Sequence, residues 1–136
     1  MPYATASLVK EIALRTYLIE PQTIFVPFLR RMLSNAGFDV IATSQGIDVR
    51  DISAHDPAAV FVDIDYLERS GPTALCRIRE ATRSAAVIAL SETNDPLFNS
   101  HCYISGANAV CSKNDGEEKF LRALRRAAVD GVGAGR

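Results

Sequence analysis

The stretch PAAVFVDID, residues 57–65, contains an unbroken apolar run that ends at Asp63. A strand that is buried on both faces of a parallel sheet has such a run, because neither face alternates with polar residues. The acid then marks the point where the chain leaves the core. This stretch therefore predicts a buried parallel strand over 58–63, with the Asp63 carboxylate at its carboxyl end.

Apolar runs alternate with helical patterns on both sides of this stretch. Four further runs predict strands at 16–20, 38–43, 85–90 and 108–112. Apolar residues that repeat every three to four positions predict the intervening helices. These helices are expected at 25–36, 46–55, 72–82, 96–105 and 117–128. Strands and helices that alternate in this way imply an α/β domain, with a doubly wound parallel sheet and helices on both faces.

The length and composition favour one globular domain. A chain of 136 residues suits a single domain with its own core. We expect this domain over 16–128, after an N-terminal extension (1–15) and before a Gly-rich flexible tail (129–136). The net charge of −1 argues against a nucleic-acid-binding surface.

The cysteines and the longest apolar runs bear on location. Cys76, Cys102 and Cys111 are odd in number and form no C-x-x-C motif, which favours reduced thiols over disulfides or metal ligands. No apolar run approaches the ~20 residues that span a bilayer. The N-terminus lacks the pattern of a secretory signal. We expect a soluble, cytoplasmic protein.

Polar residues of four kinds close the predicted strands. They are Glu20 at the first strand, Asp63 at the third, Ser91 at the fourth and Lys113 at the fifth. The carboxyl ends of the strands are where doubly wound sheets bind their ligands. Strands often end in polar residues simply because the chain enters solvent. Two acids, a hydroxyl and a lysine together nevertheless favour a functional site over coincidence.

These motifs resemble the CheY-like receiver domains of two-component response regulators, over about 16–128. The resemblance rests on YLIEP with Glu20, PAAVFVDID with Asp63, SGPTALCRIRE after it, ALSE with Ser91 and GANAVCSK with Lys113. Each motif is short, and their order and spacing carry the resemblance. It implies a flavodoxin-like sheet of five parallel strands in the order 2-1-3-4-5, flanked by five helices.

The resemblance also implies a role for each polar residue. Asp63 would be the phosphoacceptor, because a carboxylate can take a phosphoryl group as a mixed anhydride. Lys113 would pair with Asp63 and then with the phosphoryl oxygens, and Ser91 would hydrogen-bond the phosphoryl group. Mg²⁺ would be held by Glu20, by Asp63 and by the backbone carbonyl of Asp65. We expect a signalling domain rather than an enzyme, with a histidine kinase or a phosphotransfer protein as its phosphodonor.

Several positions depart from the family pattern. They are Pro21 in place of the second metal-binding acid, Asn114 in place of the proline after the lysine, Val110 at the aromatic switch position, Leu67 in place of the loop proline, and Asp65 as an additional acid. One carboxylate fewer lowers the attraction for Mg²⁺, which sheds its water reluctantly. An additional carboxylate repels an incoming phosphoryl group. We therefore predict weak Mg²⁺ binding and slow or undetectable phosphorylation of Asp63.

Two alternative classes remain open. A pseudo-receiver would keep the fold and signal through protein contacts without phosphate, a reading that Pro21, Asn114 and Val110 favour. Residues 63–65 (DID) also resemble the opening motif of haloacid-dehalogenase-type phosphatases, in which the first Asp is the nucleophile and the second a general acid. That motif normally lies on the first core strand, whereas two predicted strands precede it here.

The fourth helix, fifth strand and fifth helix form the face through which receivers commonly form dimers or bind output partners. The residues that this face would offer are Phe98, His101, Cys102, Tyr103, Arg122, Arg125 and Arg126. Apolar residues mixed with arginine suit an interface. An equally good reading puts Phe98 and Cys102 in the core. We predict a homodimer or another protein partner at this face, and no contact of this domain with nucleic acid or membrane.

Overall fold

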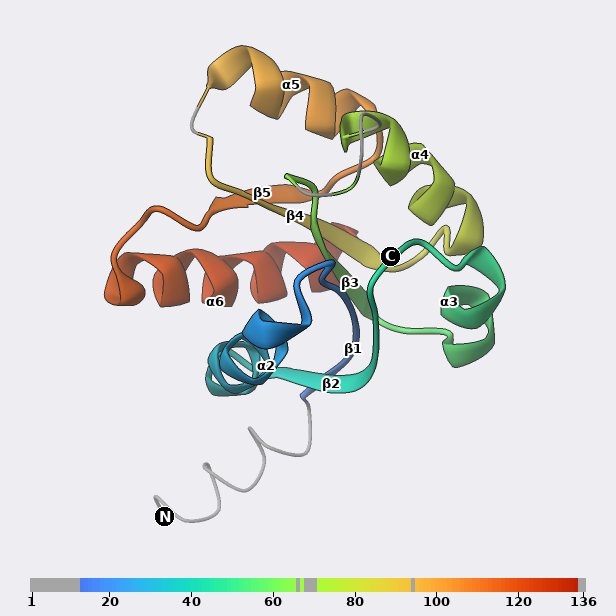
Figure 1. Cartoon of the computed structure of the whole chain (residues 1–136), viewed down its shortest axis with the longest axis horizontal. Coiled ribbons are helices and arrows are strands. Elements are labelled where there is room, and N and C mark those ends of the chain that lie inside the picture. The colour runs from blue at the N-terminus through green and yellow to red at the C-terminus, as the bar shows by residue number, and fades with distance from the viewer. Residues whose placement is uncertain (1–12, 66, 68–70, 94, 135–136) are drawn as a thin grey trace.

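A computed structural model describes residues 13–65, 67, 71–93 and 95–134 of the chain. Its five strands form one parallel sheet in the order β2-β1-β3-β4-β5, as predicted (Figure 1). The strands are β1 (Leu14–Ile19), β2 (Phe38–Ser44), β3 (Ala59–Asp63), β4 (Ala86–Ser91) and β5 (Ala109–Ser112). The predicted buried strand is thus the central one.

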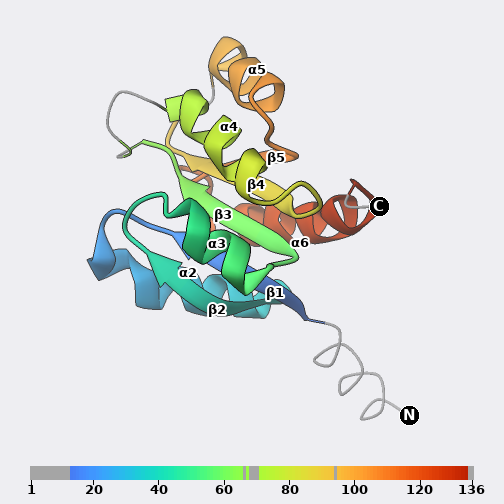
Figure 2. The same ribbon diagram turned by 90° about the vertical axis from the view of Figure 1, so that its right-hand side faces the viewer.

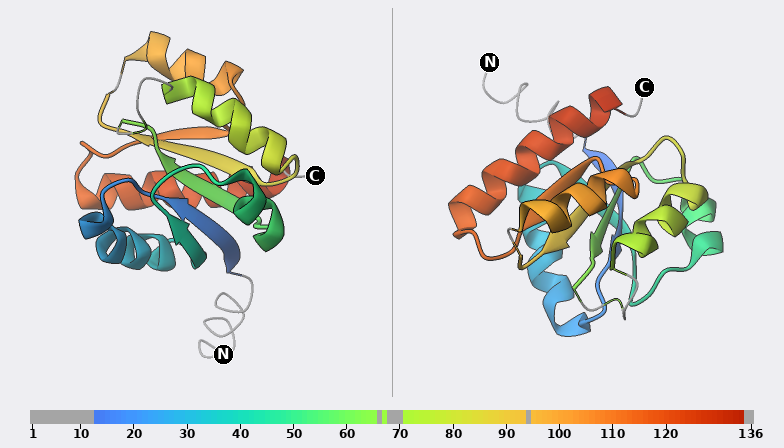
Figure 3. Two further views of the ribbon diagram at one scale, coloured as in Figure 1. Left: turned by 45° about the vertical axis from the view of Figure 1, so that its right-hand side comes forward. Right: turned by 90° about the horizontal axis from the view of Figure 1, so that it is seen from above.

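Five α-helices and one short 3-10 helix connect these strands within the described residues. They are η1 (Thr23–Phe25), α2 (Val26–Asn35), α3 (Val49–His55), α4 (Gly71–Ala81), α5 (Pro96–Ile104) and α6 (Glu117–Ala134). Helices α2 and α6 cover one face of the sheet, and α3, α4 and α5 cover the other (Figures 2 and 3). This is the doubly wound, flavodoxin-like arrangement expected from the sequence.

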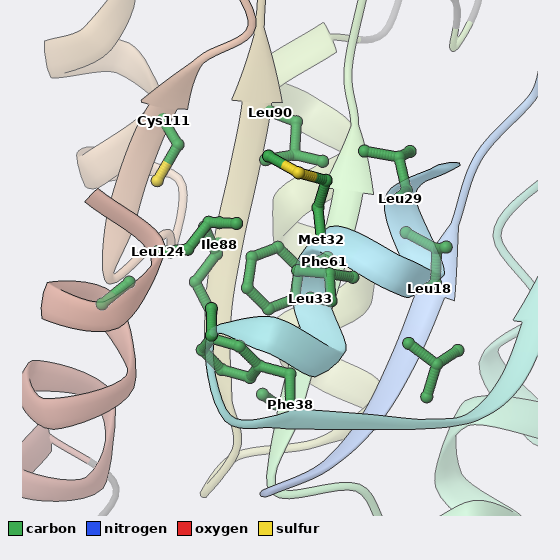
Figure 4. Packing of buried hydrophobic residues seen from close by; sticks show 14 of the residues in the cluster. Leu18, Leu29, Met32, Leu33, Phe38, Phe61, Ile88, Leu90, Cys111 and Leu124 are labelled. Carbon is green, nitrogen blue, oxygen red and sulfur yellow. The ribbon is translucent and has the colours of Figure 1, made fainter. Parts of the chain in front are cut away.

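The central strand contributes to a core on each face of the sheet. Phe61 packs with Leu33 of α2 and Leu124 of α6 in one cluster (Figure 4). Val60 and Val62 belong to the other cluster, which lies under α3, α4 and α5. All five residues of β3 are buried. The unbroken apolar run of the sequence is therefore explained, because successive side chains of a strand point to opposite faces and both faces are covered.

Local signals set several helix ends. Gly37 follows α2 with a φ of 99°, a conformation that glycine adopts without steric cost. The Asp48 side chain accepts a hydrogen bond from the Asp51 N–H at the start of α3. The Asp95 side chain does the same for the Leu97 N–H at the start of α5. These are N-caps, which satisfy N–H groups that have no partner inside the helix.

The predicted segment boundaries differ from the structure at both ends. Strand β1 begins at Leu14, inside the predicted extension (1–15), of which residues 1–12 lie outside the described residues. Helix α6 continues to Ala134 instead of ending at residue 128. The predicted flexible tail (129–136) is therefore helical up to Ala134, and its last two residues lie outside the described part. Its glycines suggested a flexible end, but glycine only weakens a helix and does not end it.

The predicted partner face is divided between core and surface. Cys102 is fully buried and Phe98 packs partly buried beside it, so these two contribute to the core. Leu97, Tyr103 and Ile104 of α5 are exposed.

No helix in the described ranges is long and apolar enough to cross a membrane.

Candidate functional site

The predicted site residues gather at the carboxyl edge of the sheet. Glu20 directly follows β1 and Lys113 directly follows β5, while Asp63 and Ser91 are the last residues of β3 and β4. Glu20, Asp63 and Ser91 are almost completely buried. The structure therefore brings the four residues to one edge, as the parallel topology requires.

The closest contact in the site joins Lys113 to Asp63. The Lys113 Nζ lies 2.5 Å from the Asp63 Oδ2. The Asp63 side chain is buried and that of Lys113 is 19% exposed. Burial alone lowers the pKa of the Lys113 amine, but the carboxylates of Asp63 and Asp65 outweigh this effect and raise the pKa. Lys113 therefore stays protonated, and it serves as the fixed counter-charge of the buried carboxylate.

Asp65 is more central to the site than the sequence indicated. Its Oδ1 accepts a 2.8 Å hydrogen bond from the Ser91 hydroxyl, and its Oδ2 accepts one of 2.8 Å from the Glu92 N–H. The Lys113 Nζ lies 3.2 Å from the same Oδ2. The Asp65 N–H in turn donates to the Asp63 Oδ1 at 3.1 Å. The sequence suggested a metal contact through the Asp65 backbone carbonyl and repulsion by its carboxylate, but it did not predict these side-chain contacts.

Glu20 has an unusual environment for an acid. It is 1% exposed, and its Oε1 accepts a hydrogen bond from the Gln22 N–H at 2.9 Å. Its Oε2 is buried without a hydrogen-bond partner among the described residues. Burial, followed by the neighbouring Asp63 carboxyl, raises the pKa of Glu20 to about 7, against the opposing effects of the Gln22 N–H and Lys113. Glu20 therefore takes up a proton near neutral pH unless a cation joins the site.

The carboxylates at this edge are ligands of the kind that a divalent cation takes. Within the described residues, no three His, Cys, Asp or Glu side chains come together as a metal-binding group. Glu20 and Asp63 offer two carboxylates, and the unpartnered Glu20 Oε2 is an oxygen that a hard cation would satisfy. Mg²⁺ is commonly bound through one or two carboxylates and several waters. Pro21 supplies no ligand, and the Asp65 carboxylate is engaged with Ser91 and Lys113.

A cavity of about 360 Å³ lies beside these groups, between α2 and α6. Its apolar wall is formed by Phe25, Phe28, Leu29, Met32 and Phe120, and its polar residues are Glu20, Gln22, Asp63, Glu92, Lys113, Asp115 and Glu117. Phe25 and Phe28 are about half exposed. Both residues fall within the helix predicted at 25–36, and both line the cavity beside the acidic edge.

The chain has a sequence relative and structural neighbours among known proteins. No protein-family model matches the chain. Over 112 residues, it is 26% identical to the DNA-binding transcriptional activator EvgA of Escherichia coli (strain K12), covering 81% of this chain and 55% of that protein. The chain thus spans about half the length of the curated relatives it matches.

Solved structures resemble the chain over most of its length. A CheY-like response regulator receiver domain protein from Methanospirillum hungatei JF-1 aligns with a TM-score of 0.68 and 14% identity, covering 85% of this chain and 94% of that one. A response regulator from Burkholderia pseudomallei was solved with a phosphorylated aspartic acid, a calcium ion and citrate. It aligns with a TM-score of 0.67 and 19% identity, covering 85% of this chain and 69% of that one.

The strand order and the solved neighbours show that this chain has the fold of a receiver-type domain. More particularly, it is the fold of CheY-like response regulator receivers, and the resemblance stated from the sequence is confirmed. Two features of the carboxyl edge depart from the pattern that the resemblance implies: Pro21 stands beside Glu20, and the Asp65 carboxylate is engaged with Lys113.

Proposed function

We propose that this domain is a phosphoacceptor module of a two-component phosphorelay, with Asp63 as the acceptor. The observation that carries this proposal is the buried Asp63 carboxylate at the end of the central strand, with the Lys113 amine 2.5 Å away. A carboxylate held beside a fixed cation is suited to accept a phosphoryl group, because this transfer depends mainly on positioning and on charge neutralisation.

The proposed reaction uses one oxygen of Asp63 as the nucleophile. The oxygen attacks the phosphorus of a phosphohistidine, or of a small acyl phosphate, and a new O–P bond forms as the bond to the leaving group breaks. Lys113 neutralises charge on the acceptor and on the phosphoryl oxygens. The leaving group departs with the bonding electrons, and imidazole takes its proton from water. We expect a histidine kinase or a phosphotransfer protein as the phosphodonor. We also expect the domain to act in the cytoplasm.

Mg²⁺, when bound, would neutralise part of the phosphoryl charge. Glu20 and Asp63 would hold it, with the Asp65 backbone carbonyl as the third contact that the resemblance implies. Two features support weak binding. Pro21 offers no carboxylate. The raised pKa of Glu20 means that a proton competes with the cation near neutral pH.

Labelling with a small phosphodonor tests the proposal. The protein is incubated with acetyl phosphate and Mg²⁺, and the modified residue is mapped by mass spectrometry after trapping of the acyl phosphate. We expect slow labelling that is confined to Asp63, and none in Asp63→Asn. Serine, threonine or histidine labelling in place of Asp63, or no labelling at any Mg²⁺ concentration, would contradict the proposal.

A pseudo-receiver is the second candidate, and the engagement of the Asp65 carboxylate favours it. Such a module would signal through protein contacts alone. The exposed apolar residues Leu97, Tyr103 and Ile104 of α5 lie on the face that we expect to bind a partner or a second copy. Absent labelling, together with unchanged partner binding in Asp63→Asn, would select this candidate. A phosphatase of the haloacid-dehalogenase type gains no support, since Asp63 lies on the third strand of the sheet and not the first.

A further inference from the structure

Three donors converge on the Asp65 carboxylate from other parts of the chain. They are the Ser91 hydroxyl at 2.8 Å, the Glu92 N–H at 2.8 Å and the Lys113 amine at 3.2 Å. A hydroxyl, a backbone N–H and an ammonium group directed at one point form a binding site for an oxyanion. In this structure the oxyanion is a side chain of the protein itself.

We infer that Asp65 is a resident anion, which occupies the donors that an incoming phosphoryl group needs. This inference deepens the proposed function and rests on it for the identity of the incoming group. A phosphoryl group on Asp63 would need hydrogen-bond donors for its own oxygens. Ser91 and Lys113 were expected to supply them, but the Ser91 hydroxyl is bound to Asp65, and the Lys113 amine contacts Asp65 as well as Asp63.

Attraction between neighbouring charges does not account for all the contacts of the Asp65 carboxylate. An acid beside a lysine is attracted to it in any case, and the Asp65 N–H contact to Asp63 is a short-range turn. The Ser91 and Glu92 donors, however, lie 26 and 27 positions away, on and just after the neighbouring strand β4. They are uncharged groups, and the Ser91 side chain is buried. A general attraction of charges does not account for these two hydrogen bonds to the two carboxylate oxygens.

The Asp65 carboxylate and an incoming phosphoryl group would compete for the same donors, because both are negatively charged. Asp63 and Asp65 carry two negative charges within reach of one Lys113 amine. A phosphoryl group brings further negative charge to the same point. Like charges at short range are unfavourable, so the Asp65 carboxylate has to leave before the phosphoryl oxygens can use the donors. Removal of this carboxylate should free the donors and let an external oxyanion bind.

The test compares Asp65→Ala and Asp65→Asn with the wild type and with Glu118→Ala. Glu118 is an exposed acid at the start of α6, and its removal changes the net charge by the same amount. Inorganic phosphate is titrated while the Glu92 amide is followed by NMR, and the labelling rate with acetyl phosphate and Mg²⁺ is measured in parallel. Asp65→Asn removes the charge while keeping the shape, so it answers the question even where Asp65→Ala fails to fold.

We expect both Asp65 variants to bind phosphate with a saturable shift of the Glu92 amide, at least tenfold more tightly than the wild type and Glu118→Ala. We also expect them to label at least tenfold faster. Phosphate binding that is no tighter in the Asp65 variants overturns the inference. Phosphate binding without labelling supports the resident anion and contradicts Asp63 as the acceptor. Equal, rapid labelling of all four proteins, without a gain in phosphate binding, contradicts the resident anion and supports the proposed function.

Discussion

The Ser91 hydroxyl donates a 2.8 Å hydrogen bond to the Asp65 carboxylate, across 26 positions of the chain. This contact ties the end of β4 to the residue that follows the central strand by two positions. Ser91 is therefore held toward the site while no phosphoryl group is present.

Substitution of Pro21 tests the missing metal ligand. Pro21→Asp should tighten Mg²⁺ binding by roughly tenfold, because an additional carboxylate increases the attraction of the site for the cation. Isothermal calorimetry of the wild type and the variant measures this. Pro21→Ala is the matched control, since it removes the fixed φ of proline without adding a ligand. Wild-type binding as tight as that of Pro21→Asp would contradict a degenerate metal site.

The stability of the metal-free protein should fall as the pH rises from 4.5 to about 7. Folding raises the pKa of Glu20 from its ordinary 4.5 to about 7, so the folded state binds more protons than the unfolded state in this window. The free energy of unfolding should decrease by about 3 kcal/mol on this account and then level off. Asp63 and Lys113 are the charged groups that face Glu20.

Urea denaturation at pH 5 and pH 8, in the presence of EDTA, measures this decrease. Glu20→Gln should lose most of it, because its amide does not titrate. Glu118→Gln, which removes an exposed acid, should keep it. A Glu20→Gln protein with the same pH dependence as the wild type would exclude Glu20 as the cause.

Arg79 should be important for the fold although it lies far from the site. Its guanidinium donates hydrogen bonds to the carbonyls of Thr82, Arg83, Ala85 and Gly106 and to the Asn108 side chain. Arg79→Ala should lower the free energy of unfolding by about 2–4 kcal/mol, because several partly buried acceptors lose their partner. Arg79→Lys should recover only part of this, since an ammonium group lacks the planar fork. A chemical denaturation midpoint equal to that of the wild type would refute this role.

The exposed residues of α5 and the arginines of α6 predict an association surface. Arg122→Glu with Arg126→Glu should weaken self-association or partner binding through this surface by at least tenfold, because the change places repelling charges at the interface. Sedimentation velocity at several concentrations measures self-association. Arg50→Glu with Arg77→Glu, on α3 and α4, is a control with the same change in charge. Unchanged association in the α6 variant would count against this surface.

The sequence predicted the sheet because its strongest signals were buried strands. The run that ends at Asp63 lacks polar alternation, and β3 is covered on both faces, so pattern and structure follow from the same physical cause. The convergence of Glu20, Asp63 and Lys113 followed from parallel topology alone. The helix expected at 46–55 is shorter in the structure, because α3 begins at Val49.

The contacts of Asp65 could not be predicted in this way. The direction of a side chain in a loop depends on donors from distant parts of the chain, and Ser91 and Glu92 belong to another strand and its loop. The exposure of Phe25 and Phe28 was missed for a related reason. They lie on η1 and α2 and are about half exposed. Apolar spacing along a helix predicts which residues share a face, but it does not show whether other residues cover that face.

The most direct test of the site combines substitutions of Pro21 and Asp65 in one protein. The initial rate of Asp63 labelling by acetyl phosphate is measured at one fixed Mg²⁺ concentration, below saturation of the wild type, in the wild type and in Pro21→Asp with Asp65→Ala. We predict that the double variant labels at least roughly 100-fold faster, because it gains a metal ligand and frees the donors held by Asp65. A wild-type protein that labels as fast as the double variant, and only at Asp63, would show that the pocket is an ordinary phosphoacceptor site.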